Sequence, residues 1–191
     1  MTSEKIKVWD MFIRIFHWSL VFSFAVAFFT EDDYLTIHTY AGYAIATLVS
    51  LRLIWGVIGG HYAQFKNFID SPRNTISYIS TVIHFKAKRH IGHNPAGGAM
   101  VLLLLVSLIL TILFGMLTYG VAEYSGPFSY FATQVTHKTA HIFKETHEFL
   151  ANFTMILVLI HIVGVAIASY QHQENLIKCM VTGYKKPKPT K

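Results

Sequence analysis

Charged residues are scarce in this sequence: they make up 14% of its 191 residues, whereas hydrophobic residues make up 53% and aromatic residues 15%. An ordinary soluble domain carries about 25% charged residues, which help to cover its surface. The shortage of charge therefore excludes an ordinary soluble domain and predicts a membrane protein.

Cysteine is almost absent as well, since Cys179 is the only one. A single thiol excludes disulfide frameworks, thiolate metal clusters and a covalent c-type haem, which needs two cysteines just before a histidine. Any haem must therefore be b-type and held by histidine, and we expect Cys179 to be an inert thiol in the tail. The N-terminus also lacks a small-residue cleavage site after its first apolar run, so we expect that run to remain as a membrane span.

Long apolar runs are what the sequence has instead. Four of them can cross a hydrocarbon core of about 30 Å as helices. We therefore predict the all-α class: an integral membrane four-helix bundle in residues 1–175, followed by a basic tail in residues 176–191. The predicted spans are Phe12–Thr30, Leu35–Ile58, Met100–Val121 and 147–170, the last with its apolar part at Phe149–Tyr170 and its helix starting within Thr136–His147.

The connections between these runs differ in length. The first, Glu31–Tyr34, is so short that the helices on either side must be antiparallel neighbours. The second, Gly59–Gly98, is long and basic, and Ser71-Pro72 predicts the cap and first position of a further helix within it. We expect that helix to lie along the membrane surface.

The distribution of charge predicts the orientation, because short loops rich in Lys and Arg stay in the cytoplasm. Most basic residues lie on the side of the termini and of the long connection, so we predict a protein of the bacterial inner membrane with both termini cytoplasmic. We expect the chain after Gly183 to be a solvated, disordered end with mild affinity for anionic membrane lipid. The opposite, periplasmic side is acidic: it carries Lys138 and Lys144 against Glu31, Asp32, Asp33, Glu123, Glu145 and Glu148.

Histidines within the spans are the main candidates for function, because ionisable residues there are costly. His147 and His161 are fourteen residues apart on one helix, which separates them by about 21 Å but turns them by about 40° less than four full turns. Both rings therefore lie on one face at two depths. His17 matches the depth of His161, and His38 matches that of His147. Two bis-histidine haems are predicted, with iron atoms about 20 Å apart.

Other interpretations of these histidines remain open at this point. Four membrane histidines could instead form separate hydrogen bonds between helices, and His141 could replace His147, although it lies on the face opposite His161. A bare metal ion would need three or four ligands at one depth. We expect the remaining histidines outside the spans to be solvated, apart from a surface metal that His137 and His141 could bind: these are His61, His84, His90, His93 and His172.

Small and basic residues near the four histidines favour the haem interpretation. A porphyrin beside a helix needs small side chains one turn from its ligand, and Gly42 and Gly164 hold such positions after His38 and His161. Arg14 and Arg52 lie at the depth of the cytoplasmic pair, where they could bind haem propionates. Snorkelling to the membrane interface is the alternative for both.

Four motifs in order make the sequence similar to a known family: Arg14-Ile15-Phe16-His17-Trp18, Arg52-Leu53-Ile54-Trp55-Gly56, Gly92-His93-Asn94-Pro95 with Gly97-Gly98, and His147-Glu148 with His161. Between about Val8 and Tyr170 the chain resembles the prokaryotic cytochrome b561 group, which includes the b-type cytochrome subunits of nickel-iron hydrogenases. The resemblance implies two haems b on His17 with His161 and on His38 with His147, and electron exchange with membrane quinone. Helix three would shape the pocket without coordinating iron.

These observations lead us to expect a dihaem b-type cytochrome that carries electrons between the quinone pool and a periplasmic partner. The acidic face favours a basic partner such as a c-type cytochrome, and the protein could thereby act as a quinol or quinone oxidoreductase. A superoxide:quinone oxidoreductase is an alternative that the same acidity disfavours; a subunit of a hydrogenase-like complex and a haem-free proton relay or assembly partner are others. Gly56 and Gly60 could support a homodimer, and no nucleic-acid partner is expected.

Overall fold

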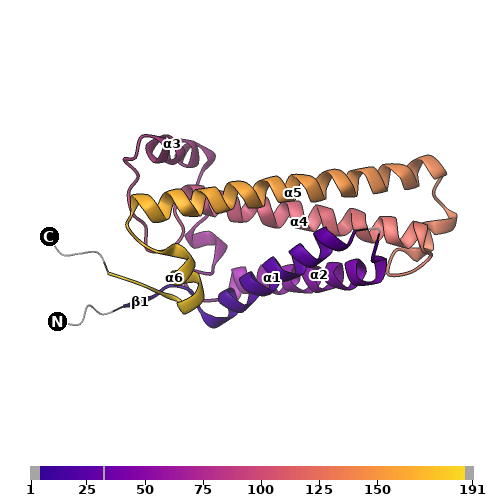
Figure 1. Ribbon diagram of the computed structural model, residues 1–191, viewed down its shortest axis with the longest axis horizontal. Coiled ribbons are helices and arrows are strands. Elements are labelled where there is room, and N and C mark those ends of the chain that lie inside the picture. The colour runs from indigo at the N-terminus through magenta and orange to yellow at the C-terminus, as the bar shows by residue number, and fades with distance from the viewer. Residues whose placement is uncertain (1–4, 32, 188–191) are drawn as a thin grey trace. The chain divides into compact units, whose positions relative to one another are not determined.

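The computed structural model describes residues 5–31 and 33–187, and most of these form helices. Four helices are long and apolar enough to cross a membrane, as Figure 1 shows: α1 (Met11–Thr30), α2 (Leu35–Ile58), α4 (Pro95–Ala122) and α5 (His137–Gln171). The predicted all-α class with four candidate spans is confirmed, and the protein is a multi-pass membrane protein.

Two compact units divide the chain, and each long helix contributes a segment to both. Unit 1 consists of Met1–Ser19, Ser50–Leu102 and Ile160–Lys191, and unit 2 of Leu20–Val49 and Leu103–Leu159. In unit 2 the core includes a hydroxyl group from α5: Thr154 is 1% exposed, and its Oγ1 lies 2.6 Å from Ser107 Oγ on α4. This bond joins the two helices, since a buried hydroxyl needs a partner.

Two of the long helices begin earlier than their apolar runs. Asn94 accepts a hydrogen bond from Gly97 N at 2.7 Å, and Pro95 follows it, so this cap starts α4 five residues before the predicted span. Thr136 accepts one from Thr139 N at 3.3 Å, and α5 begins at His137, within the predicted range. Polar caps, rather than hydropathy, set both starting points.

The helix predicted in the second connection is present as α3 (Pro72–Ile83). Ser71 Oγ accepts a hydrogen bond from Asn74 N at 3.2 Å, which confirms the predicted cap. A 3-10 turn, Phe65–Asn67, precedes α3 in the same connection, and a second one, Ser129–Thr133, follows α4.

The C-terminal segment of unit 1 differs from the solvated tail that we predicted. It forms α6 (Leu176–Thr182) and β2 (Tyr184–Lys185), and β2 pairs antiparallel with β1 (Ile6–Lys7). Gly183, at φ +87°, turns the chain between α6 and β2. Its main-chain oxygen accepts hydrogen bonds from Val8 N and Trp9 N. Cys179 is buried in α6 rather than in a free tail. Asp32 and the residues after 187, which the charge argument used, lie outside the described residues.

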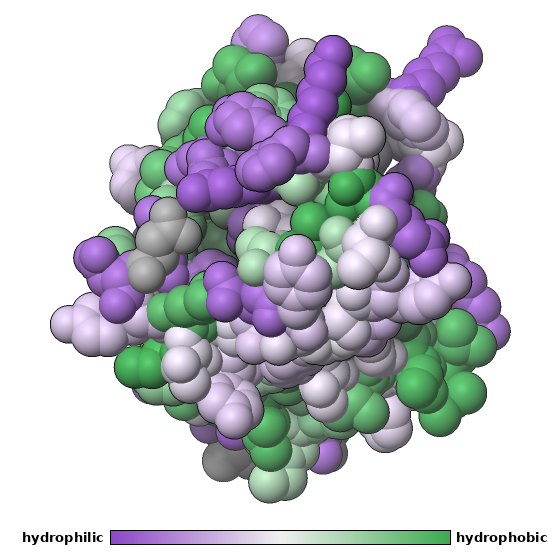
Figure 2. All heavy atoms as spheres, turned by 90° about the vertical axis from the view of Figure 1, so that its right-hand side faces the viewer, coloured by the Kyte–Doolittle hydropathy of each residue, from purple (hydrophilic) through white to green (hydrophobic). Residues whose placement is uncertain are grey.

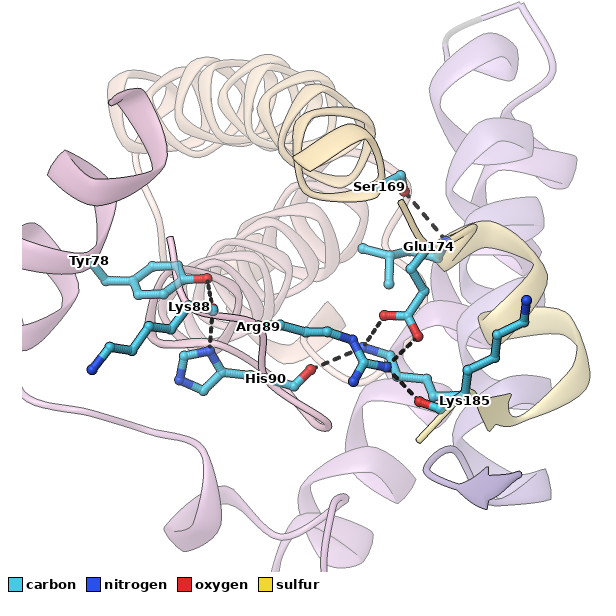
Figure 3. Close-up of polar contacts among 9 residues, drawn as sticks. Tyr78, Lys88, Arg89, His90, Ser169, Glu174 and Lys185 are labelled. Carbon is cyan, nitrogen blue, oxygen red and sulfur yellow. Dashed lines mark hydrogen bonds and ion pairs between the residues drawn. The ribbon is translucent and has the colours of Figure 1, made fainter. Parts of the chain in front are cut away.

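An ion cluster explains why a basic tail can pack here. Glu174 Oε1 lies 2.8 Å from Arg89 Nη2, and its Oε2 lies 3.5 Å from Lys185 Nζ, with the Glu174 and Lys185 side chains almost fully buried (Figure 3). Lys185 and Arg89 together hold the pKa of Glu174 below its usual value, although burial acts in the opposite direction. The Glu174 carboxylate thus compensates the charges of Arg89 and Lys185, two side chains that hydropathy alone would place in solvent.

Candidate functional site

Two helices bring His38 and His147 together in unit 2. The centroids of their rings are 5.9 Å apart, and the ring planes make an angle of 88°. His38 Nδ1 donates to the main-chain oxygen of Ala27 on α1 at 2.9 Å, and His147 Nδ1 donates to that of Thr111 on α4, also at 2.9 Å. Because each proton is held on Nδ1, Nε2 of both rings carries the lone pair that a metal needs.

Glycines shape the space around this pair. A Cβ atom at Gly42 would meet nothing within 4 Å, so the chain leaves room one turn after His38. A Cβ atom at Gly115 on α4 would instead lie 2.8 Å from Cε1 of His147, so only glycine lets this ring approach. Gly115 was not predicted as a site residue, because nothing in the apolar run around it indicates contact with the His147 ring.

His17 and His161 form the corresponding pair in unit 1. Their ring centroids are 6.5 Å apart at an angle of 55°, and Trp18 packs edge to face against His17 at 5.0 Å. His17 Nδ1 is buried and has no hydrogen-bond partner among the described residues. A Cβ atom at Gly164, three residues after His161, would meet nothing within 4 Å. Both pairs thus combine facing rings with open space beside a glycine.

The ring spacing fits a metal ion between each pair of imidazoles. A metal–imidazole bond is about 2.0 Å long and the ring centre lies about 1.1 Å further, so two rings on one ion have centroids about 6.2 Å apart. The observed 6.5 and 5.9 Å lie on either side of this value. Edge-to-face packing permits similar spacings of about 4.5–7 Å. No group of three or more metal-binding side chains occurs in the described part of the chain, so a bare ion lacks its further ligands.

Two buried arginine donors in unit 1 lack partners among the described residues, which is compatible with a bound haem. Arg52 is 3% exposed, donates from Nη2 to Ala63 O at 3.1 Å and stacks on Phe65, but its buried Nη1 has no partner among the described residues. The same holds for Nε of Arg14, which lies one turn before His17. An unsatisfied buried donor costs about 1–3 kcal/mol. A carboxylate-bearing group, such as a haem propionate, is the kind of ligand that a guanidinium binds, and the burial of Arg52 shows that its side chain does not snorkel.

His93 was predicted to be solvated, and this is wrong. Its ring packs against Phe68 at 4.4 Å and Trp9 at 4.7 Å, and its buried Nδ1 has no partner among the described residues. Burial, together with the charges of Arg52 and Lys185, lowers the pKa of His93 to about 3. The Asn94 cap and the start of α4 fix the loop that turns this ring inward, which the sequence could not show. His93 Nδ1 thus joins His17 Nδ1, Arg52 Nη1 and Arg14 Nε as a buried nitrogen of unit 1 without a partner among the described residues.

We expect the neutral His93 ring to make stability depend on pH. The unfolded chain takes up a proton below about pH 6.5 while the folded ring does not, so the free energy of unfolding falls as pH drops from 6.5 toward 3. At pH 5 the loss relative to pH 7.5 is about 2 kcal/mol. Chemical unfolding in detergent at both pH values should show the full loss in the wild type and in His61→Gln, an exposed control. In His93→Gln the loss should be about 2 kcal/mol smaller, while His172, whose pKa burial also lowers, still contributes. An equal loss in all three proteins would contradict the contribution of His93.

The other histidines divide differently from our expectation. His61 and His84 are exposed as predicted, whereas His90 and His172 are partly buried. His141 is exposed and lies 3.6 Å from the Glu145 carboxylate, so it is His147, not His141, that faces His38.

Four long apolar helices that carry two pairs of neighbouring imidazoles define the class of a multi-pass helical membrane protein. The family model for prokaryotic cytochrome b561 matches residues 8–183, and the chain belongs to this family. No curated protein and no solved structure matches the chain. Membership makes the protein a membrane cytochrome of electron transport and implies haem b as its cofactor.

Proposed function

We propose that His17 with His161, and His38 with His147, would hold two haems b, and that the protein carries electrons between the quinone pool and a periplasmic partner. The observation that carries this proposal is the presence of two histidine pairs, each with a ring spacing close to that of two imidazoles on one iron. Bound haem b supplies a one-electron couple whose potential the protein sets through ligands, burial and hydrogen bonds.

The surrounding residues have separate roles in this proposal. The main-chain oxygens of Ala27 and Thr111 orient the rings of His38 and His147 and strengthen them as ligands. Gly42 and Gly164 leave space for the porphyrin edges. Arg14 and Arg52 would pair with haem propionates, and their positive charge would raise the reduction potential of that haem.

The surface of unit 2 supports a basic periplasmic partner. Exposed carboxylates Glu31, Asp33 and Glu123 lie in the connections at this end of α1, α2 and α4. Figure 2 shows the molecule from the right-hand side of Figure 1. Many hydrophilic side chains lie in the upper part of this view, and many hydrophobic ones lie along its outer edge. With both termini on the cytoplasmic side, this acidic end faces the periplasm, where complementary charge would steer a c-type cytochrome.

Stopped-flow spectroscopy tests the function directly. We expect two haems b per purified chain, reduction by a short-chain quinol, and reoxidation by a basic ferricytochrome c at a rate that falls with rising salt. The triple variant Glu31→Gln, Asp33→Asn, Glu123→Gln should react about tenfold more slowly with the cytochrome at low salt. Its reduction by quinol serves as the control and should not change.

The outcomes separate the parts of the proposal. A colourless protein would overturn the haem assignment, and haems that quinol does not reduce would overturn the quinone link. A cytochrome reaction insensitive to salt and to the triple substitution would overturn the choice of partner.

A further inference from the structure

Helix α3 presents an apolar face that the rest of the described chain does not cover. Ile76, Ile79 and Ile83 recur at helical spacing and are 69%, 43% and 68% exposed. Ser77 and Tyr78 lie on the opposite face, where Tyr78 is buried and its hydroxyl donates to Lys88 O at 3.1 Å (Figure 3). A helix with one exposed row of isoleucines and one polar face is amphipathic and lacks an apolar partner.

Two contacts attach α3 to the end of a membrane-spanning helix. Gln171, the last residue of α5, donates from Nε2 to Val82 O at 2.6 Å. The ring of Phe85 packs edge to face on Tyr170 at 6.4 Å, and both side chains are exposed. Figure 1 shows α3 beside this end of α5. These two contacts place the C-terminal end of α3 next to the C-terminal end of α5 within unit 1.

The charges around α3 favour an anionic surface. Arg73, Lys86 and Lys88 are exposed, and no ion pair of these three occurs among the described residues, whereas Arg89 is bound to Glu174. The one carboxylate in residues 70–90 is Asp70, which accepts hydrogen bonds from Asn74 Nδ2 and Ser71 N. Lys86 and Lys88 follow α3 and line a surface hollow together with Ser77 and Tyr78 of its polar face. Cations on the polar side of an amphipathic helix are typical of helices that lie in an anionic membrane interface.

We propose that α3 is an in-plane interfacial helix whose isoleucine face inserts among anionic phospholipids, with Arg73, Lys86 and Lys88 binding their phosphodiester headgroups. The surface is independent of the haem sites. It anchors the long connection between α2 and α4 to the same leaflet that α5 enters.

Spin labels on the full chain in lipid nanodiscs test this proposal. In a Cys179→Ser background, labels at Ile79→Cys and, as the matched opposite-face control, Ser77→Cys are compared for collision with oxygen, which concentrates in lipid, and with a water-soluble nickel chelate. We expect the Ile79 label to favour oxygen and the Ser77 label to favour the chelate. Equal access of both labels to the chelate would overturn insertion, and dipolar broadening between Ile79 labels would show that a second copy covers the face instead.

The headgroup preference needs a second measurement. The fraction of phosphatidylglycerol retained against phosphatidylcholine in purified protein should fall about fivefold for each of the substitutions Arg73→Gln, Lys86→Gln and Lys88→Gln. Lys66→Gln removes an exposed cation that precedes α3 in the chain and serves as the control. Displacement of the lipid by inorganic phosphate alone, or no loss of lipid in the Arg73, Lys86 and Lys88 variants relative to this control, would overturn binding of a lipid headgroup. Haem spectra of these variants should be unchanged, so failure here is distinguishable from failure of the proposed function.

Discussion

Purified His38→Ala and His147→Ala variants are expected to keep one of the two haems b, and both should keep the same one. His17→Ala and His161→Ala should keep the other. This follows because the two imidazoles of each pair face each other at 5.9 and 6.5 Å, and a low-spin haem loses its site when one axial ligand is removed. Pyridine haemochrome analysis gives the number of haems, and low-temperature difference spectra show which one remains.

His141→Ala is the control for these variants. His141 lies on the same helix as both α5 ligands but is exposed and contacts Glu145, so its removal should leave both haems in place. If His17→Ala and His38→Ala lost the same haem, the pairing would be wrong. If any of the four variants kept both haems, that histidine would not be a ligand.

Replacing Gly42 by leucine is expected to abolish the haem at His38 and His147 without destabilising the polypeptide. A Cβ atom at this position meets nothing within 4 Å, so the protein without haem has room for it, and leucine favours a helix over glycine by about 1 kcal/mol. A bound porphyrin would fill this space, and the leucine would exclude it. The haem content of Gly42→Leu should therefore fall by one per chain, as measured by the haemochrome assay.

Gly164→Leu is the reciprocal variant, because Gly164 has the same open space beside His161. It should lose only the haem at His17 and His161. Circular dichroism of both variants prepared without haem should match that of the wild type. Full haem content in Gly42→Leu would show that the space beside His38 is not where the porphyrin lies.

Hydropathy and the helical period were enough to predict the ends of α1 and α2, and a local cap was enough to predict the start of α3. The spans that became α1 and α2 end where the apolar runs end, and Ser71-Pro72 starts α3, because a cap needs only local residues. The rings of His17 and His161, and those of His38 and His147, lie next to each other as rise and rotation per residue predicted. That each pair binds a haem stays a prediction.

Tertiary structure alone decided the features that depend on distant partners. The acceptor for His147 is a main-chain oxygen of Thr111, and main-chain groups carry no sequence signal. Gly115 matters because a ring from another helix approaches it, and Lys185 is buried because Glu174 compensates its charge. His93 is buried although its own loop is polar. In each case the neighbour lies on another segment of the fold, so local composition cannot show whether a polar group will meet water or another residue.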